Sequence, residues 1–157
     1  MAEEIKIGII SDTHNLLRKE VLEELSSCQV ILHGGDISKP EILQELQKIA
    51  PVYAVRGNND KEWAEGMPEI LNLNIAGLSI CMCHKKKDLP EDLKNFDLIV
   101  YGHSHKYEMT EKKHQIFLNP GSCGPRRFNQ PITMAVGFLK KGKIRIEKIE
   151  IPHEEKK

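Results

Sequence analysis

Short apolar runs alternate with segments of helical spacing along the first third of the chain. The runs at 5–10, 30–33 and 52–55 are rich in β-branched residues and lead into polar residues or glycine, which predicts three strands. Residues 16–25 carry apolar positions at helical spacing, and residues 40–50 begin with a proline, which is tolerated at a helix start, so both predict helices. This order of strands and helices is typical of βαβ crossovers and predicts a parallel sheet.

The pattern changes after residue 70. Residues 71–75 and 78–83 flank an Ala-Gly pair and predict a hairpin, residues 89–95 predict a short helix, and residues 98–101 predict a further strand. The remaining strand candidates are antiparallel, with a Lys-Lys-Gly turn between the last two, and cover 107–111, 115–118, 132–139 and 143–149. We therefore expect one α/β domain over residues 1–157, with parallel strands first and antiparallel strands later.

The composition narrows the class of protein. The 157 residues include 23 basic and 23 acidic side chains without a long block of one sign, which argues against a dedicated nucleic-acid binder or a membrane-surface protein. No apolar stretch approaches the roughly 20 residues of a transmembrane helix, and the acidic start of the chain resembles no secretory signal. The four cysteines lack the spacing of a disulfide framework. We expect a cytoplasmic protein.

Polar residues follow five of the predicted strands at their carboxyl ends. In an open α/β sheet these ends converge on the crevice where ligands bind. We therefore expect the five loops to meet in one place. The candidate ligands on these loops are Asp12, His14, Asp36, Asn58, His84, His103 and His105.

These residue types favour metal binding. Asp12 and His14 would point the same way if their strand continued, and Asp36 offers a carboxylate that can bridge two cations. Oxygen and imidazole ligands without thiolate favour Mn, Fe, Ni, Co or Zn over Ca or a closed structural zinc site. Two such ions about 3.5–4 Å apart would hold a bridging hydroxide for in-line attack on phosphorus. By spacing, His103 and His105 would share one ion.

The order of these motifs resembles the calcineurin-like metallophosphoesterase family, and within it the small bacterial and archaeal phosphodiesterases. The motifs are D-x-H from residue 12, G-D ending at 36, G-N-x-D from 57, a single His at 84 and G-H-x-H ending at 105. The Asn-Pro-Gly-Ser loop at 119–122 is also similar to that branch. The resemblance implies an α/β fold of two mixed β-sheets packed as a sandwich and flanked by helices, in four layers.

The resemblance also implies how the ligands divide between two divalent metal ions per chain. Asp36 would bridge the two ions, and His103 and His105 would bind different ions, unlike the arrangement that spacing favours. Manganese is the first expectation, with Ni, Fe, Co or Zn as alternatives, and homo-oligomers occur in the family. The implied ligand sets are Asp12, His14, Asp36 and His105 for one ion, and Asp36, Asn58, His84 and His103 for the other.

Two positions depart from the family's phosphatases. Asn59 stands where those enzymes have a His that can protonate the leaving group, and the phosphodiesterase branch also lacks that His. We therefore expect a phosphodiesterase acting on a small phosphodiester. Lys85–Lys87 follow His84, where the family has Gly, and could reach a substrate phosphate or form a solvated turn. Arg56 could pair with a substrate phosphate or with a surface carboxylate, so Asn59 and Arg56 are the candidate substrate-binding residues.

Simpler interpretations of single residues compete with a metal site. Asp, Asn and similar residues are favoured at helix caps, but four histidines at the same strand ends need another explanation. Cys81 and Cys83 suggest zinc together with His84; strand alternation instead places both cysteines on the face opposite His84, which favours core packing. We expect His33 in the core or supporting a ligand, Cys28 and Cys123 as structural thiols, Trp63 and Met67 in packing or beside a substrate cleft, and His114 and His153 on the surface.

Two other functions remain open. A retromer subunit resembles this fold and acts mainly as a protein-interaction scaffold, so the chain could be a non-catalytic binding module. Seven polar ligands in one crevice favour catalysis over a scaffold. Other members of the wider family are nucleases, but the balanced charge and the lack of a DNA-binding segment make a nucleic-acid partner the weaker expectation.

Overall fold

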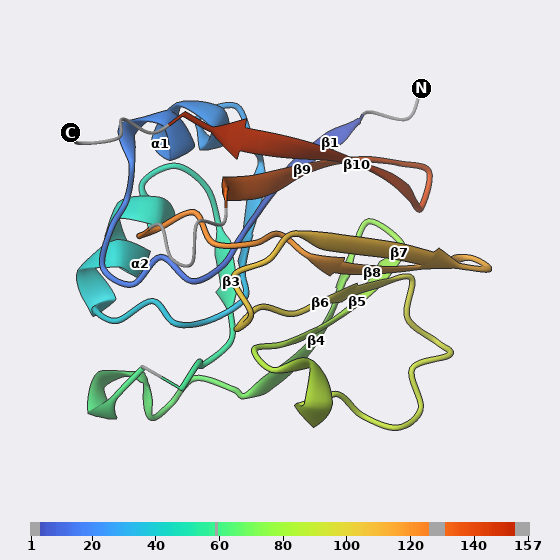
Figure 1. Ribbon diagram of the computed structural model, residues 1–157. Coiled ribbons are helices and arrows are strands. Elements are labelled where there is room, and N and C mark those ends of the chain that lie inside the picture. The colour runs from blue at the N-terminus through green and yellow to red at the C-terminus, as the bar shows by residue number, and fades with distance from the viewer. Residues whose placement is uncertain (1–3, 59, 126–130, 153–157) are drawn as a thin grey trace.

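Two mixed five-stranded sheets pack face to face in the computed structural model, which describes residues 4–58, 60–125 and 131–152 (Figure 1). The first sheet has the order β10-β9-β1-β2-β3. Strands β1, β2 and β3 are parallel, with β3 at one edge. Strand β9 pairs antiparallel with β1, and β10 pairs antiparallel with β9 at the other edge. The strands are β1 (Ile5–Ile10), β2 (Val30–His33), β3 (Val52–Ala54), β9 (Ile132–Lys140) and β10 (Lys143–Ile151).

The second sheet has the order β4-β5-β6-β8-β7. Its three inner strands are parallel, and β4 and β7 are antiparallel strands at its edges. The strands are β4 (Ile70–Ile75), β5 (Leu78–Cys83), β6 (Leu98–Val100), β7 (Glu108–Lys112) and β8 (Gln115–Asn119). Two mixed sheets confirm the expected sandwich, whereas the expectation of antiparallel strands after residue 70 is only partly right, because β5, β6 and β8 are parallel.

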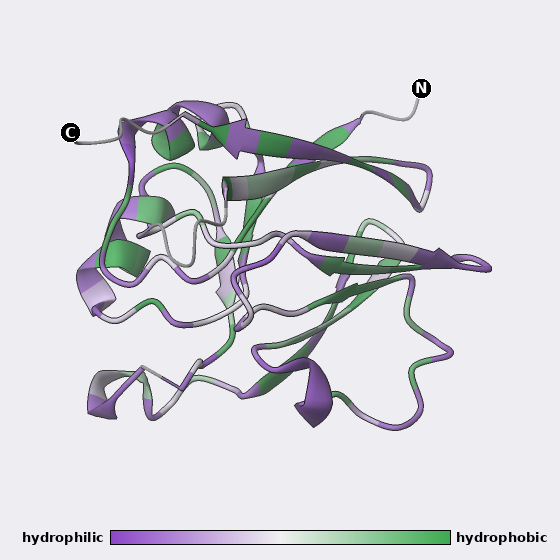
Figure 2. Ribbon diagram, viewed as in Figure 1, coloured by the Kyte–Doolittle hydropathy of each residue, from purple (hydrophilic) through white to green (hydrophobic). Residues whose placement is uncertain are grey.

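Alternating side chains give the first sheet two apolar faces. Ile7 and Ile9 of β1 point into the space between the sheets, where they meet Ile80 and Met82 of β5. Ile10, of the same strand, belongs to a second apolar cluster on the opposite face. Each such side chain contributes roughly 1.5–3 kcal/mol when buried. In Figure 2, β1 and β8 carry green segments, whereas the edge strand β7 is mostly purple to pale.

Helices α1 (Lys19–Leu25) and α2 (Pro40–Gln47) cover that opposite face. Val21 and Leu25 of α1 and Ile42 and Leu46 of α2 are buried in the same cluster as Ile10. The helix predicted from residue 16 begins only at Lys19, because the preceding segment forms a turn that is hydrogen-bonded to the loop after β2. A helix layer therefore lies outside the first sheet.

The predicted helix at 89–95 is wrong. A short 3₁₀ turn, η2 (Lys86–Asp88), is followed by bends and turns up to β6. The side chain of Gln115 on β8 donates to the carbonyls of Leu93 and Phe96, and the Asp97 carboxylate accepts from Ser79 N at 2.9 Å. Hydrogen bonds from the second sheet therefore replace the backbone bonds of a helix in this segment.

Both predicted hairpins form. Ala76 and Gly77 connect β4 to β5 with φ of 47° and 91°, and Lys141 and Gly142 connect β9 to β10 with φ of 53° and 75°. Two positive φ angles are the signature of the tight turn that matches the twist of a hairpin. Within the described residues, no helix is long and apolar enough to cross a membrane.

Candidate metal centre

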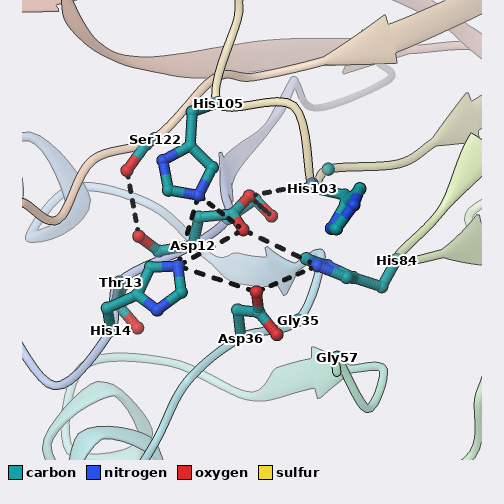
Figure 3. A network of polar contacts seen from close by, with 12 residues as sticks. Asp12, Thr13, His14, Gly35, Asp36, Gly57, His84, His103, His105 and Ser122 are labelled. Atoms are coloured by element: carbon teal, nitrogen blue, oxygen red, sulfur yellow. Dashed lines mark hydrogen bonds and ion pairs between the residues drawn. The ribbon is translucent and has the colours of Figure 1, made fainter. Parts of the chain in front are cut away.

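All seven candidate ligands lie on loops at the carboxyl ends of strands, and these loops meet where the two sheets adjoin. The loops after β1, β2 and β3 in the first sheet carry Asp12, His14, Asp36 and Asn58, and those after β5 and β6 in the second carry His84, His103 and His105. Figure 3 shows the four imidazoles and two carboxylates pointing toward one another.

The loop after β1 does not continue the strand. The strand ends at Ile10, and Asp12 and His14 have φ of 56° and 45°. The backbone N–H of Asp12 donates to Gly35 O and that of His14 to Asp36 O, each at 2.9 Å, so the loop is attached to the turn after β2. The strand therefore does not continue to His14, yet the turn still brings the two side chains together.

The histidines and carboxylates form two groups. In one, ligand atoms of Asp12, His14 and His105 all lie within 4.8 Å of one another, and in the other those of Asp36, His84 and His103 do so. Asp36 Oδ2 is 3.1 Å from His84 Nε2 and 3.6 Å from His14 Nε2, so this carboxylate lies between the groups. His103 and His105 fall in different groups, unlike the sharing that spacing alone favours.

The polar atoms at the centre suit cations. The buried Oδ1 of Asp12 accepts no hydrogen bond from the described residues, although His105 Nε2 is 3.4 Å away and Nε2 of His14 and of His84 are each 3.7 Å away. These distances are long for hydrogen bonds. They nevertheless bring four atoms that could bind a metal, the Asp12 oxygen and three imidazole nitrogens, around one space. A buried acceptor surrounded by imidazole nitrogens fits a common metal ion.

Asn58 completes the second group. With one orientation of its amide, the side-chain nitrogen donates to both Asp36 oxygens and to His84 Nε2, each at 3.2 Å. With the amide turned over, the oxygen takes that place among acceptors, as ligation of a cation requires. The residues present therefore fit two divalent ions with nitrogen and oxygen ligands.

Neighbouring groups orient the ligands. Ser11 Oγ donates to Asp12 Oδ2 at 2.7 Å, and the backbone N–H of His103 donates to the same oxygen at 3.2 Å. His84 donates from Nδ1 to Gly34 O at 2.7 Å, which leaves its Nε2 lone pair directed at the centre. Such bonds set the ring orientation before any metal binds.

Charges at the centre reinforce one another. Burial opposes ionisation of Asp12, but contacts with His105 and His14 hold its pKa well below the usual value. Burial lowers the pKa of His84, while the hydrogen bond with Asp36 and the charge of Asp12 act the other way and raise it overall. The pKa of His103 is lowered, chiefly by burial and then by the charges of His84 and Lys85. The carboxylate of Asp12 is thus held in its ionised form at the centre.

His33 supports the site without a free nitrogen, in agreement with its predicted place. Its Nδ1 accepts from Gly35 N at 3.1 Å, so Nε2 donates to Thr13 Oγ1 at 3.1 Å. Burial lowers the pKa of His33 to about 4, which keeps the ring neutral. The ring thereby ties the loop after β1 to the loop after β2.

Asp60 is a positioning residue that sequence reasoning passed over. Its buried carboxylate accepts four backbone N–H bonds, from Asp36 at 3.0 Å, Ile37 and Ser38 at 2.8 Å, and Gly57 at 2.9 Å. It therefore holds the Asp36 loop against the Asn58 loop. The motif G-N-x-D contains this Asp, so its place in the motif was the available signal.

The loop at 119–122 also supports the centre. Asn119 Nδ2 donates to Gly102 O at 3.2 Å and to Ser104 Oγ at 3.0 Å, and Ser122 Oγ donates to Asp12 O at 3.0 Å. The sequence indicated a similarity at this loop without a role. Its side chains hold the loops that carry Asp12 and His103.

The structure places one of the two predicted substrate-binding residues, Arg56, beside the centre. Arg56 lines a cleft of about 260 Å³ beside Asn58 and His84, and its Nε donates to Asp60 O at 3.2 Å. Asn59 lies outside the described residues. Lys85 lines the same cleft, so the lysine segment reaches the centre.

The remaining candidates pack in the core. Trp63 and Met67 pack against the apolar cluster beneath the helices, and Trp63 Nε1 donates to Ser38 O at 3.0 Å. Cys81 and Cys83 are buried and free, and Cys83 Sγ donates to Lys85 O at 3.2 Å. Neither cysteine joins the two metal-binding groups found among the described residues, which agrees with core packing.

Comparison with known proteins identifies relatives that match most of this chain. The family model for the calcineurin-like phosphoesterase superfamily domain matches residues 5–142. A phosphodiesterase of Methanocaldococcus jannaschii is 29% identical over 141 residues, which cover 76% of this chain and 84% of the relative.

Two solved structures share the fold. An archaeal phosphodiesterase has a TM-score of 0.76 at 24% identity and covers 94% of this chain and 100% of its own. Vacuolar Protein Sorting 29 of Cryptosporidium parvum also has a TM-score of 0.76, at 22% identity, and covers 96% of this chain and 99% of its own. At these identities the likeness establishes the fold only.

Proposed function

The chain belongs to the calcineurin-like phosphoesterase superfamily, and we propose that it is a phosphodiesterase that works with two divalent metal ions. The observation that carries the proposal is the position of Asp36 between the two groups of ligands. A single carboxylate in that position can give one oxygen to each of two ions. When bound, such ions lower the pKa of a water molecule and offset the charge of a phosphoryl group.

The ligand set guides the choice of metal. Asp12, Asp36 and Asn58 offer oxygens, and the four histidines offer nitrogens. Manganese suits such a set, and Ni, Fe, Co and Zn are the alternatives. All four cysteines are free and none is required as a ligand, which supports a reducing, cytoplasmic location.

The chain's own residues prepare the centre for a phosphodiester. Ser11 and the His103 amide keep the Asp12 carboxylate in one orientation, and Gly34 O keeps Nε2 of His84 facing inward. Arg56 in the adjoining cleft can pair with a non-bridging oxygen of the phosphate at the centre. An asparagine at 59 cannot supply a full proton to a leaving group at neutral pH, so diesters with acidic leaving groups are favoured over monoesters.

Two alternatives share this fold. A protein-interaction scaffold has no need for seven polar side chains that converge on one space, and each buried polar group without a partner destabilises the folded state by about 1–3 kcal/mol. A nuclease would be expected to carry an excess of positive charge along its substrate path, whereas 23 basic and 23 acidic residues balance here. Hydrolysis of a small diester would distinguish an enzyme from a scaffold.

The proposal predicts metal-dependent hydrolysis of bis-p-nitrophenyl phosphate. Manganese-loaded protein should hold two ions per chain by elemental analysis and should hydrolyse the diester faster than p-nitrophenyl phosphate, a monoester. Chelation should abolish the activity and added Mn²⁺ should restore it, because water must be activated by the bound ions. Asp36→Asn and His84→Ala should each reduce kcat by about 100-fold or more, because each removes a proposed direct ligand of the ions, and even the outer partners of ligands are worth about 10–100-fold.

Matched variants control for nonspecific effects. Asp92 and His114 are exposed and lie outside the centre, so Asp92→Asn and His114→Ala should keep full activity and both ions. One ion per chain, or activity that survives chelation, would contradict the two-metal proposal. Two bound ions without hydrolysis of any diester would favour the scaffold.

A further inference from the structure

A second cleft, here called the lysine cleft, adjoins the candidate metal centre. Its volume is about 470 Å³, and its lining includes Lys85, Lys86, Lys87, His103, Tyr101 and Glu108. The smaller cleft of about 260 Å³, here called the arginine cleft, is lined by Arg56, Asn58 and His84. His84 and His103 belong to the same ligand group, and Lys85 lines both clefts. A diester bound at the centre can therefore extend into both.

The two clefts differ in charge. The lysine cleft has three lysines and one acid, Glu108. The arginine cleft has two bases, Arg56 and Lys85, against three acids, Asp60, Glu69 and Asp88. A ligand group with negative charge is thus attracted to the lysine cleft, because like charges repel and opposite charges attract most strongly where walls exclude water. The asymmetry gives the centre one side that prefers anions.

The acid in the lysine cleft is already engaged. Tyr101 donates its hydroxyl to Glu108 Oε1 at 2.5 Å, and Lys86 Nζ is 3.7 Å from the same oxygen. Lys86 Nζ also lies 5.3 Å from the centre of the Tyr101 ring, so ring and carboxylate place this ammonium at the cleft wall. An exposed ion pair such as Lys86–Glu108 contributes little free energy. The Lys86 ammonium can therefore bind a phosphate instead of Glu108 at little cost in stability.

The other two ammonium groups remain available. Lys85 is half-buried and Lys87 is exposed, and neither has an acidic partner within 4 Å among the residues that the structure describes. Three ammonium groups beside one engaged carboxylate exceed what a single diester phosphate needs, since that phosphate would sit on the metal ligands. The surplus positive charge calls for a further anion.

We propose that the lysine cleft binds a second phosphate of the substrate, so that this centre acts on phosphodiesters that carry a further phosphate group. The inference rests on the proposed function for the position of the scissile phosphate. The further phosphate lies against Lys85, Lys86 and Lys87, and the uncharged part of the substrate extends into the arginine cleft. Phosphate is the anion best suited to several ammonium groups at once, because its three oxygens can each accept a charged hydrogen bond.

A pair of substrates that differ by one phosphate tests the proposal. Manganese-loaded protein is assayed with the dinucleotide ApA and with its 5′-phosphorylated form, pApA. We expect kcat/KM about tenfold higher for pApA, since one or two charged hydrogen bonds of this kind are worth roughly that factor. In Lys85→Gln/Lys87→Gln the ratio of the two kcat/KM values should approach one. Lys94→Gln, an exposed lysine of the same segment outside both clefts, should keep the wild-type ratio.

Binding gives a readout that does not depend on hydrolysis. Equilibrium dialysis compares adenosine 3′,5′-bisphosphate with AMP on the manganese-loaded protein. The bisphosphate should bind about tenfold more tightly to wild type and to Lys94→Gln, and this advantage should disappear in Lys85→Gln/Lys87→Gln. Added salt should reduce the advantage, because exposed charges are screened.

The outcomes separate this inference from the proposed function. Suppose that both dinucleotides are hydrolysed at equal kcat/KM and that AMP and the bisphosphate bind equally. This result would overturn the proposed phosphate site in the lysine cleft and would leave the proposed phosphodiesterase activity supported. Tighter binding of the bisphosphate that depends on the lysines, without hydrolysis of either dinucleotide, would support the phosphate site in the lysine cleft. It would overturn the proposed phosphodiesterase activity. A bisphosphate advantage that persists in the lysine variant would also contradict the proposal.

Discussion

The buried carboxylate of Asp60 joins two of the loops that form the candidate metal centre. Both of its oxygens are occupied by backbone N–H groups of the loops that bear Asp36 and Asn58. At the same time Asp36 and Ser38 have φ of 58° and 81°, a conformation that side-chain-bearing residues rarely adopt. Such backbone strain costs roughly 1–3 kcal/mol per residue and persists only where surrounding bonds impose it. At the scale of single residues, the hydrogen bonds of Asp60 hold the backbone of the Asp36 loop in this conformation, and this conformation directs the Asp36 side chain to the centre.

Asp60→Asn is predicted to lower both stability and metal affinity. An asparagine replaces one acceptor oxygen by an NH₂ group that would face backbone donors, so two of the four N–H bonds are lost. The free energy of unfolding, measured by urea titration of metal-free protein, should fall by about 2 kcal/mol or more. Titration with Mn²⁺ should also show weaker binding, because Asp36 is no longer held in place.

Asp92→Asn is the matched control. Asp92 is exposed and accepts one backbone bond, from Lys94 N at 3.2 Å, so this variant should stay within about 0.5 kcal/mol of wild type. Equal stability of Asp60→Asn and Asp92→Asn would mean that Asp60 does not organise the loops.

At the scale of secondary-structure elements, tight hairpin turns set the register of β4–β5 and β9–β10. Both turns require two residues with positive φ, and only the second position of each is glycine. A side chain added to Gly142 would approach no closer than 3.8 Å to Gly77 O, so space does not limit this position. The backbone conformation alone makes glycine favourable there.

Two substitutions in the β9–β10 turn should therefore change stability in opposite directions. Gly142→Ala should lower the free energy of unfolding by about 1–2 kcal/mol, the usual cost of the left-handed region for an L-residue. Lys141→Asn creates an Asn-Gly pair, which suits this turn type, and should raise it by several tenths of a kcal/mol. Thermal unfolding of both variants checks the signs, with diester hydrolysis as a control for the distant centre. A stabilising Gly142→Ala would rule out the turn conformation.

At the scale of the whole molecule, one sheet serves two apolar cores. The first sheet packs against the second on one face and against α1 and α2 on the other, and the candidate centre lies where strand ends of both sheets meet. The four cysteines are buried in different parts of this framework. Burial raises the pKa of the Cys81 thiol to about 11 and that of Cys123 to about 12.

The thiols should consequently react slowly in the native protein. At pH 8 only about one in a thousand Cys81 groups is ionised, and the thiolate is the reactive form. The aromatic disulfide DTNB should label the native protein far more slowly than a free thiol, and all four cysteines should react at once in guanidinium chloride. Fast labelling of Cys123 without denaturant would show that the region around the centre opens locally.

The amino-acid sequence by itself determined the positions of the strands and the seven candidate ligands, but not the parallel pairing of β5, β6 and β8. Apolar periodicity is a local property, and the ligand motifs stand directly after strands, so both can be recognised without knowing the fold. The assignment of His103 and His105 to different ions came from the family resemblance. A spacing of two residues in a loop does not determine which ion each side chain faces.

Tertiary structure decided what depends on contacts between distant segments. Residues 89–95 form no helix, and Gln115 on β8 binds the carbonyl of Leu93 within that segment and the carbonyl of Phe96 just after it. The segment after β1 turns at Asp12 because the loop after β2 accepts its N–H groups. The role of Asp60 likewise exists only once two loops lie side by side. Local pattern selects the elements and supplies the chemical groups, whereas hydrogen bonds between loops determine where those groups point.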